Sequence, residues 1–340
     1  MRLSQRVLEM KTGKLFAVLA TIMLTAASTT EAAEIQISTE NTTSHFQTVV
    51  LQTYAAALNS HIPEHNFEVI HSARAFSDRD VAEAVSSGRV AIAAPGIWHL
   101  GRYSSDLNAL LLPSFMGLGA ADVRAVVDGP VGRTLQSALE KQLNVKVIGR
   151  WLDLGPAHIF TREKEITSFE DLKGLRIRYP GGEANALRLS ALGAIPVLIP
   201  WPNVPEALDR EEIDGLLTTT STVVSAALWD HGINYAFLSH SYYPFYLPLI
   251  SGDIWNRLPA QQRRLIEDDW EAMIEDGRAL AVRHQEQSLF TLREHGIEIT
   301  TPSSEERDHQ RSELLGQQHS MADIIGISEE TKAVIEAIRN

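Results

Sequence analysis

The sequence predicts an α/β protein of two lobes around a ligand cleft, and three observations lead to this prediction. Strand and helix patterns alternate along the chain instead of gathering in separate blocks, which is typical of α/β sheets. The strand-rich stretches form two sets of similar size, which meet near residue 155. A helical pattern over residues 258–296 would run roughly 50 Å at 1.5 Å per residue, so it can lie along both sets.

The first set alternates regularly between strands and helices. Strands are predicted at EIQIST (34–39), FEVIHS (67–72), RVAIAAP (89–95) and NVKVIGRWL (144–152). Helices are predicted over 43–60 and 78–87, and two more lie between 120 and 143. An order of strand, helix, strand, helix, strand favours parallel pairing, with binding loops at the carboxyl ends of the strands.

The second set has the same character. Strands are predicted at HIFT (158–161), LRIRYP (175–180), PVLIP (196–200), GLLTT (215–219) and YAFLSH (235–240). Ser168 is a predicted cap of the short helix FEDLKG, which the following glycine ends. A last strand, GIEITTP, and helices near 303–316 and 328–339 complete the chain.

The long helical pattern has clear ends. Pro259 suits a first helical turn, and Gly296 follows the last turn. Because an interior glycine costs about 1 kcal/mol relative to alanine, two helices broken near Gly277 remain an alternative. We assign residues 34–155 with about 247–275 to lobe I, and residues 156–246 with about 276–340 to lobe II.

The amino terminus predicts export through a signal peptide. Arg2, Arg6, Lys11 and Lys14 precede the apolar run LFAVLATIMLTAAS, and small residues follow it. This order is typical of a secretory signal over residues 1–33, cleaved after Ala32 or Ala33. An apolar run of about 14 residues is short for a membrane span, which needs roughly 20. An uncleaved membrane anchor is the alternative, and either reading places the working domain outside the cytoplasm.

Composition excludes several classes of function. Removing residues 1–33 takes away four basic and two acidic groups, which moves the formal charge from -13 to about -15. Such a negative surface repels nucleic acid. The sequence contains no cysteine, which excludes disulfides, thiolate metal sites and cysteine nucleophiles. We therefore expect a protein that depends on its apolar core for stability.

Signatures of catalysis and of metal binding are missing. GxSxG, SxxK, HExxH and the phosphate-loop pattern GxxxxGK[ST] do not occur in the sequence. His61 and His65 have the i, i+4 spacing of a metal pair, but Pro63 between them argues against a regular helix. We expect no enzyme activity, no cofactor and no metal. An exported α/β hydrolase remains the rival prediction.

A series of segments resembles one known family. DLKGLRIRYPGG, ALGAIPVLIPWPNVPEAL, EIDGLL and SHSYYPFYLPLISGDIWNRLPAQQRRLI, preceded by AEAVSSGRVAIAAPG, LLLPSFMG and VVDGPVG, occur in the family's order. The chain is similar to the solute receptors of TRAP (tripartite ATP-independent periplasmic) transporters, of the dicarboxylate-receptor (DctP) type. The resemblance covers essentially the whole chain after residue 33.

The resemblance implies a fold, a location and a function. The fold is periplasmic binding protein-like, with two α/β lobes, a cleft between them and a long helix that spans both. The receptor works in the periplasm, closes on a small organic acid, and delivers it to separate TRAP membrane subunits. A receptor that signals to a membrane partner is an alternative that the sequence leaves open.

Arg178 is the strongest candidate for a ligand contact. The resemblance implies that the arginine of this strand forms a salt bridge with the ligand carboxylate. Independently, a guanidinium matches a carboxylate with two parallel hydrogen bonds and stays charged at any relevant pH. Arg176 lies on the same strand and is the alternative, and we favour Arg178 because it lies nearer the strand's carboxyl end. A surface ion pair with Glu183 is the structural alternative.

Two positions depart from the family pattern. Ala157 stands where relatives often carry an arginine, and Thr218 and Thr219 replace a common Asn-Pro pair. Further candidates follow strand ends or carry aromatic rings that suit a small-molecule site: Thr42, Trp98, Trp201, Tyr242 and Tyr243. For each aromatic residue singly, core packing is an equally good interpretation.

Overall fold

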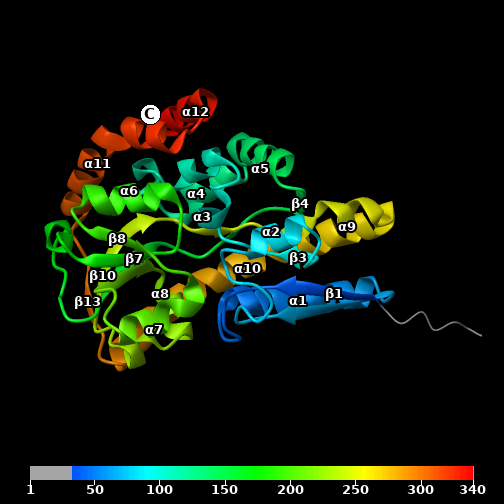
Figure 1. Cartoon of the computed structure of the whole chain (residues 1–340), viewed down its shortest axis with the longest axis horizontal. Helices are drawn as coiled ribbons and strands as arrows, with labels where there is room; N and C mark the ends of the chain where they lie inside the picture. Colours follow the sequence, from blue (N-terminus) through cyan, green and yellow to red (C-terminus); the bar gives the residue numbers. More distant parts are fainter. Residues whose placement is uncertain (1–32, 340) are drawn as a thin grey trace, which may run out of the picture. The chain divides into compact units, whose positions relative to one another are not determined.

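The computed structural model describes residues 33–339, which contain two main sheets as predicted (Figure 1). The predicted signal peptide lies outside this range apart from its last residue. One sheet has the strand order β2-β1-β3-β12-β4, and the other has the order β13-β10-β6-β9-β7-β8. The strands of the first sheet are β1 (Ala33–Ser38), β2 (His65–Ile70), β3 (Ile92–Ala93), β4 (Val145–Val147) and β12 (Leu249–Ser251). Those of the second are β6 (Ala157–Thr161), β7 (Arg176–Tyr179), β8 (Ile195–Leu198), β9 (Gly215–Thr218), β10 (Tyr235–Tyr242) and β13 (Glu298–Thr300).

The first sheet confirms the predicted parallel pairing. β1 pairs in parallel with β2 and with β3. Helix α1 (Phe46–His61) packs beside β2, and it buries the apolar residues that recur at helical spacing, among them Val50, Tyr54 and Leu58. β12 arrives from late in the sequence and pairs antiparallel with β3 and β4. Of the predicted strand at 89–95, only Ile92 and Ala93 form β3.

The second sheet mixes parallel and antiparallel pairs. β7 pairs in parallel with β8 and β9, whereas β6 pairs antiparallel with β9 and β10. Two short strands, β5 (Leu152–Asp153) and β11 (Phe245–Tyr246), form a separate antiparallel pair. They lie in the two segments by which the chain passes between the main sheets.

The helices follow the predicted order with some shifted ends. Besides α1 they are α2 (Val81–Ser86), α3 (Ile97–Leu100), α4 (Ala120–Val127), α5 (Pro130–Gln142), α6 (Glu183–Ala191), α7 (Val204–Asp209), α8 (Thr220–Ser225), α9 (Gly252–Arg257), α10 (Ala260–Glu294), α11 (Ser304–Ile325) and α12 (Glu329–Arg339). The 3-10 helices are η1 (Ser105–Leu111), η2 (Pro113–Phe115), η3 (Phe169–Leu172), η4 (Trp201–Asn203) and η5 (Leu228–His231). The cap at Ser168 is present, with Asp171 completing a capping box. The helix predicted over 303–316 continues to Ile325, and η1 and η2 were not predicted.

Helix α10 is one continuous helix of 35 residues, so the alternative break near Gly277 is wrong. A Cβ atom at Gly277 would lie 3.3 Å from Leu152 Cδ1 and 3.3 Å from Val50 Cγ2. The glycine therefore permits close packing of α10 against α1 and β5. α10 also contacts α8 and β13, so it touches elements associated with both sheets, as predicted.

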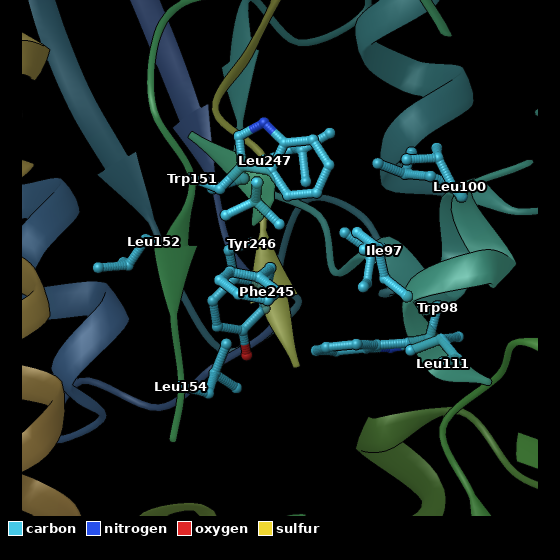
Figure 2. Close-up of a cluster of buried hydrophobic side chains, with 14 of the residues drawn as sticks. Ile97, Trp98, Leu100, Leu111, Trp151, Leu152, Leu154, Phe245, Tyr246 and Leu247 are labelled. Carbon is cyan, nitrogen blue, oxygen red and sulfur yellow. The ribbon is translucent and has the colours of Figure 1, made fainter. Parts of the chain in front are cut away.

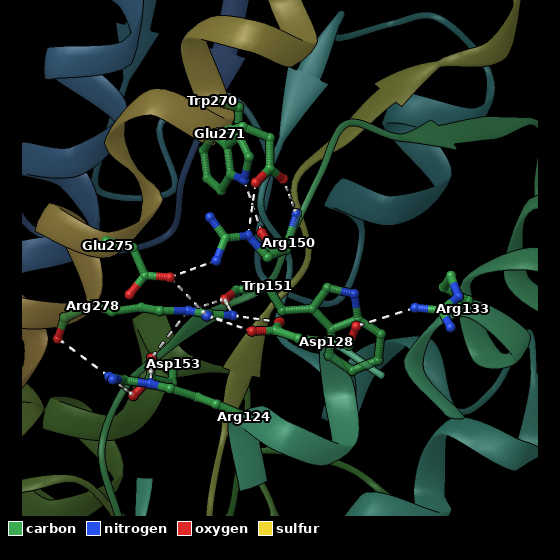
Figure 3. A network of polar contacts seen from close by, with 10 residues as sticks. All are labelled: Arg124, Asp128, Arg133, Arg150, Trp151, Asp153, Trp270, Glu271, Glu275 and Arg278. Carbon is green, nitrogen blue, oxygen red and sulfur yellow. Dashed lines mark hydrogen bonds and ion pairs between the residues drawn. The ribbon is translucent and has the colours of Figure 1, made fainter. Parts of the chain in front are cut away.

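A partly buried ionic network fixes α10 to the segment between β4 and β5 (Figure 3). The Arg278 side chain is 2% exposed, donates to the Trp151 carbonyl oxygen, and forms two bonds of 2.7 and 2.8 Å with Asp128. Two turns before Arg278 on α10, Glu271 Oε2 accepts a hydrogen bond from Arg150 Nε at 2.7 Å. The exact boundaries of the lobes stay a prediction, although β12 joins the first sheet and β13 the second.

Between residues 33 and 339, no helix combines the length and apolar character that crossing a bilayer requires.

Candidate functional site

A cavity lies where loops from the two sheets meet. The space between its lining atoms is about 390 Å³, and this volume includes open solvent at the mouth of the cavity. Its walls come from the loops after β1, β2, β7, β8 and β9, from α3 and α8, and from the segments next to β5, β10 and β11. The lining residues are Glu40, Asn41, Asp78, Trp98, Leu154, Arg178, Pro180, Trp201, Leu217, Thr218, Thr219, Thr222, Tyr242, Pro244 and Tyr246.

Arg178 is buried in this wall, with 2% of the residue exposed. It is the third residue of β7 and lies one residue before the carboxyl end of that strand. Its Nε donates to the Ile199 carbonyl oxygen at 2.9 Å, and its guanidinium lies 5.6 Å from the centre of the Trp201 ring. Among the described residues, its Nη2 has no hydrogen-bond partner. Burial lowers the pKa of Arg178 to about 10, so the side chain remains charged at neutral pH.

Arg176 has a different environment from Arg178. Its Nε and Nη2 bind both carboxylate oxygens of Asp214 at 3.1 and 2.6 Å, and its side chain is 41% exposed. Arg178 forms no ion pair within 4 Å in the described part of the chain, so the surface pair with Glu183 is absent. Of the two arginines, only Arg178 lines the cavity.

Asp78 lies in the cavity wall beside Trp201. Its Oδ2 accepts a hydrogen bond from the Trp201 backbone N–H at 2.9 Å and lies 3.2 Å from His99 Nε2. Burial raises the pKa of this carboxyl, but the contact with His99 and the charge of Arg178 outweigh burial and hold the pKa below its usual value. Asp78 is therefore a fixed negative charge in the wall.

Four predicted site residues line the cavity together with Arg178: Trp98, Trp201, Thr218 and Tyr242. A second buried arginine, Arg188, lies over the face of the Tyr242 ring, with its guanidinium carbon 5.3 Å from the ring centre. Arg188 does not line the cavity, because its guanidinium donates to the Leu111 carbonyl oxygen and to Asn185. It supports the Tyr242 ring from behind.

Three predicted site residues lie elsewhere. Thr42 is at the junction of the two loop layers, where its hydroxyl donates to the Ser225 carbonyl oxygen at 3.3 Å. Ala157 is fully buried at the start of β6 and pairs with Tyr242 on β10. The Tyr243 hydroxyl donates to Asp153 at 3.2 Å, behind the cavity. None of the three lines the cavity.

Sequence reasoning missed Glu40, Asn41, Asp78 and Tyr246. Glu40 and Asn41 follow β1 directly, which is the position that led to the prediction of Thr42. The Asn41 amide donates to Gln47 at 2.5 Å and to the Tyr246 hydroxyl at 2.8 Å, which fixes this corner of the wall. The strand-end rule could have found Glu40, whereas Tyr246 is brought in by the distant strand β11.

Glu40 is a buried carboxyl with 7% exposure. Burial and the nearby charge of Asp78 raise its pKa to about 8, against smaller opposing effects of a backbone hydrogen bond and Tyr246. Glu40 therefore carries a proton at neutral pH. Within residues 33–339, no cluster of His, Cys, Asp or Glu side chains could hold a metal ion.

The sequence of the chain matches a known family. The model of the DctP family, described as bacterial extracellular solute-binding protein, family 7, matches residues 30–321. The C4-dicarboxylate-binding periplasmic protein DctP of Rhodobacter capsulatus is 25% identical over 272 residues, which are 79% of this chain and 80% of that protein. The 2,3-diketo-L-gulonate-binding periplasmic protein YiaO of Escherichia coli is 25% identical over 217 residues, 64% of this chain and 65% of that protein.

Solved structures share the fold. The sugar acid binding protein DctPAm of Advenella mimigardefordensis, in complex with galactonate, has a TM-score of 0.84 at 18% identity and covers 90% of this chain and 97% of its own. A TRAP periplasmic solute binding protein of Sulfurospirillum deleyianum, with bound succinate, has a TM-score of 0.83 at 19% identity. The match covers 90% of this chain and 99% of that protein. The two sheets, the long helix and the match over residues 30–321 lead to one conclusion: the chain belongs to the DctP family of bacterial extracellular solute-binding proteins.

Proposed function

We propose that this protein is a periplasmic receptor that binds a small organic acid through Arg178 and delivers it to the membrane subunits of a TRAP transporter. One observation carries the proposal. Arg178 lines the cavity between the loops of the two sheets, is 2% exposed, and has an Nη2 group without a hydrogen-bond partner among the described residues. A ligand carboxylate would supply that partner.

The energetics of a buried arginine favour this role. An unsatisfied polar group in the interior costs about 1–3 kcal/mol, and a charged group costs more. A carboxylate placed against the guanidinium satisfies the free N–H group and opposes the charge at the same time. Burial lowers the pKa of Arg178 and the charge of Asp78 raises it, but Asp78 forms no ion pair with Arg178 within 4 Å.

Relatives support the ligand class. Structural neighbours have been solved with galactonate, succinate and D-erythronate, and each of these compounds carries a carboxylate. Curated relatives are named as binding proteins for C4-dicarboxylate, sialic acid and 2,3-diketo-L-gulonate. We infer that this chain also binds a carboxylate, and that it performs no chemistry on it.

Closure of two lobes would bury the ligand. Two contacts already join the loop layers: the Trp201 backbone N–H donates to Asp78, and the Thr42 hydroxyl donates to the Ser225 carbonyl oxygen. We propose lobe boundaries near residues 155 and 247 and within α10 near residue 275. Trp201, which is half-buried, would then close over the carboxylate held by Arg178.

A binding experiment tests the proposal. The mature protein is screened against small carboxylates by thermal shift, and hits are titrated by calorimetry. A ligand at 100 times its dissociation constant raises the free energy of unfolding by roughly 2.7 kcal/mol. We expect Arg178→Gln to weaken binding of the best ligand by about tenfold to a hundredfold, which corresponds to a charged hydrogen bond of about 1.5–3 kcal/mol.

Arg176→Gln is the matched control, because it removes an arginine from the same strand that is already paired with Asp214. We expect it to leave the affinity unchanged, and circular dichroism checks that both variants fold. Unchanged affinity in Arg178→Gln would remove this residue from the proposal. If no carboxylate raises the melting temperature, the whole proposal fails. Receptor-dependent uptake into vesicles that contain TRAP membrane subunits separates transport from a sensing role.

A further inference from the structure

The cavity contains acidic groups as well as its arginine. Glu40 and Asp78 line it together with Arg178, and the two carboxyls are 7% and 2% exposed. Both acids come from loops at the carboxyl ends of first-sheet strands, whereas Arg178 comes from β7 of the second sheet. The cavity therefore has a basic wall and an acidic wall.

The charges that line the cavity disfavour a dicarboxylate. Within the part of the chain that the structure describes, Arg178 is the only basic side chain among the lining residues. Asp78 is ionised, and its negative charge already balances part of the positive charge of Arg178. One ligand carboxylate can pair with Arg178, but a second would add a buried negative charge near the ionised Asp78. Like charges in a buried site repel strongly, and no other cation is present in the wall to offset them.

Glu40 lacks the positive partner that a buried carboxylate requires. Among the described residues, no Lys, Arg or His nitrogen lies within 4 Å of its oxygens. Its side-chain neighbours are the Asn41 amide, 3.5 Å away, and the Tyr246 hydroxyl. The carboxyl consequently keeps its proton at neutral pH. A cationic group of a ligand would provide the missing charge and displace that proton.

Aromatic rings line the same wall. The centres of the Trp98 and Tyr246 rings lie 5.5 Å apart, and Figure 2 shows Trp98 on α3 near Phe245 and Tyr246. The indole Nε1 of Trp98 is buried and has no partner among the described residues. Aromatic faces next to carboxylates attract a positively charged nitrogen through the ring quadrupole. An acidic and aromatic wall is thus suited to an ammonium group.

We propose that the ligand is a small zwitterion, which places one carboxylate on Arg178 and one cationic nitrogen between Glu40, Asp78, Trp98 and Tyr246. This inference rests on the proposed function, because it assumes that Arg178 holds a carboxylate. It identifies the class of ligand as amino-substituted monocarboxylic acids. The net charge that such a ligand brings into the cavity is zero.

Matched ligand sets test the proposal. Each set contains an amino acid, the corresponding hydroxy acid and the corresponding dicarboxylic acid, for example 4-aminobutyrate, 4-hydroxybutyrate and succinate, with further sets of three and five carbons. Titration calorimetry at pH 7 measures each affinity. In the set of the best size, we expect the zwitterion to bind about tenfold or more tightly than the other two members, a difference of about 1.4 kcal/mol.

The outcomes separate this inference from the proposed function. If the hydroxy acid or the dicarboxylic acid binds as tightly as the zwitterion, the zwitterion proposal is overturned while carboxylate binding through Arg178 stands. If no member of any set binds, both proposals fall. A zwitterion that binds equally well to Arg178→Gln would overturn the proposed function.

Glu40→Gln provides the variant test, since it keeps the shape of the side chain and removes its charge. We expect the ratio of the affinities for the zwitterion and the hydroxy acid to fall about tenfold, which reports the lost ion pair. Glu34→Gln, an exposed acid on β1, is the matched control and leaves the ratio unchanged. An unchanged ratio in Glu40→Gln would refute the assignment of the cationic group to this wall.

Discussion

Arg178 and Arg176 lie two residues apart on β7, and only Arg178 reaches the cavity wall. A charged side chain at the end of an apolar strand led to the prediction of a ligand contact; the structure places Arg178 in the cavity wall, and the ligand contact stays a proposal. The choice between Arg176 and Arg178 could not come from periodicity, because residues two apart on a strand point to the same face. Their surroundings differ, because Arg176 is paired with Asp214 and Arg178 lines the cavity, and this difference supports the proposal for Arg178.

Glu40 predicts a pH dependence of stability. Its pKa is raised from 4.5 to about 8, so its stabilising contribution is complete below about pH 4.5 and is lost as pH rises through 8. Between pH 5 and 8, we expect the free energy of unfolding of the ligand-free protein to fall, relative to Glu40→Gln, by up to about 1.4 kcal/mol per pH unit. Urea unfolding at several pH values measures the difference.

The comparison with Glu40→Gln isolates the contribution of Glu40. It is needed because other buried groups change the free energy of unfolding with pH in the opposite direction. Burial lowers the pKa of His45 to about 3, with a smaller effect from His284, so His45 removes stability as pH falls below its unfolded value of 6.5. Parallel stability curves for the wild type and Glu40→Gln would contradict the raised pKa of Glu40.

Binding of the proposed zwitterion adds a second pH effect at Glu40. The bound cation favours the ionised carboxyl, so each binding event at pH 7 should release about one proton, given the pKa of about 8. Affinity is then expected to rise with pH up to about 8. Calorimetry in two buffers of different ionisation enthalpy measures the released protons, and Glu40→Gln should release none. Asp78, Tyr246 and Arg178 face the same space, and none of them changes its charge near pH 7.

The strand-end rule could find Glu40, but the place of Asp78 in the acidic wall could not be predicted from the sequence. In the sequence, Asp78 follows Ser77 in a pattern that resembles the start of a helix, so nothing local marks Asp78 as a site residue. In the structure, α2 begins three residues later, at Val81. What makes Asp78 part of the site is its contact with Trp201, 123 residues later in the chain. Local pattern carries no information on such a pairing, and the same is true of Tyr246 on β11.

At the scale of elements, the packing of α10 depends on Gly277. We expect Gly277→Val to destabilise the protein by about 1–3 kcal/mol, because its side chain would overlap Leu152 and Val50, whose atoms are 3.3 Å from an added Cβ. Thermal or urea unfolding measures the change. Gly277→Ala should have a smaller effect, since its gain in helix propensity opposes the crowding.

Gly316→Ala is the matched control in a second helix. Gly316 lies inside α11, and an added Cβ would meet nothing within 4 Å. Here only the helix propensity changes, so we expect stabilisation of about 0.5–1 kcal/mol. Equal effects of alanine at positions 277 and 316 would indicate that α10 has room to accept a side chain at its contact with α1.

Elements with strong periodicity were predictable, and short ones were not. α1, α10 and the strands β1, β7 and β9 were recognised because apolar residues recur at the spacing of their own backbone. η1 and η2 escaped prediction because a 3-10 helix of a few residues has no repeat to detect. β12 lies in the first sheet through long-range pairing with β3 and β4, which no local pattern specifies.

At the scale of the whole molecule, the proposed closure is measurable in solution. Small-angle scattering of the wild type should show a lower radius of gyration with saturating ligand than without it, because the lobes approach each other on binding. Arg178→Gln at the same ligand concentration should keep the larger radius. Identical scattering curves for the free and the saturated wild type would indicate a binding site that is formed without closure.

The cavity takes its walls from the ends of strands, while the bodies of the same strands form the apolar core. The charged lining residues Glu40, Asp78 and Arg178 lie outside the apolar core, whereas the lining residues Trp98, Tyr242 and Tyr246 belong to it. Over evolutionary time, such a receptor can acquire a new cargo through a few loop substitutions while its scaffold persists.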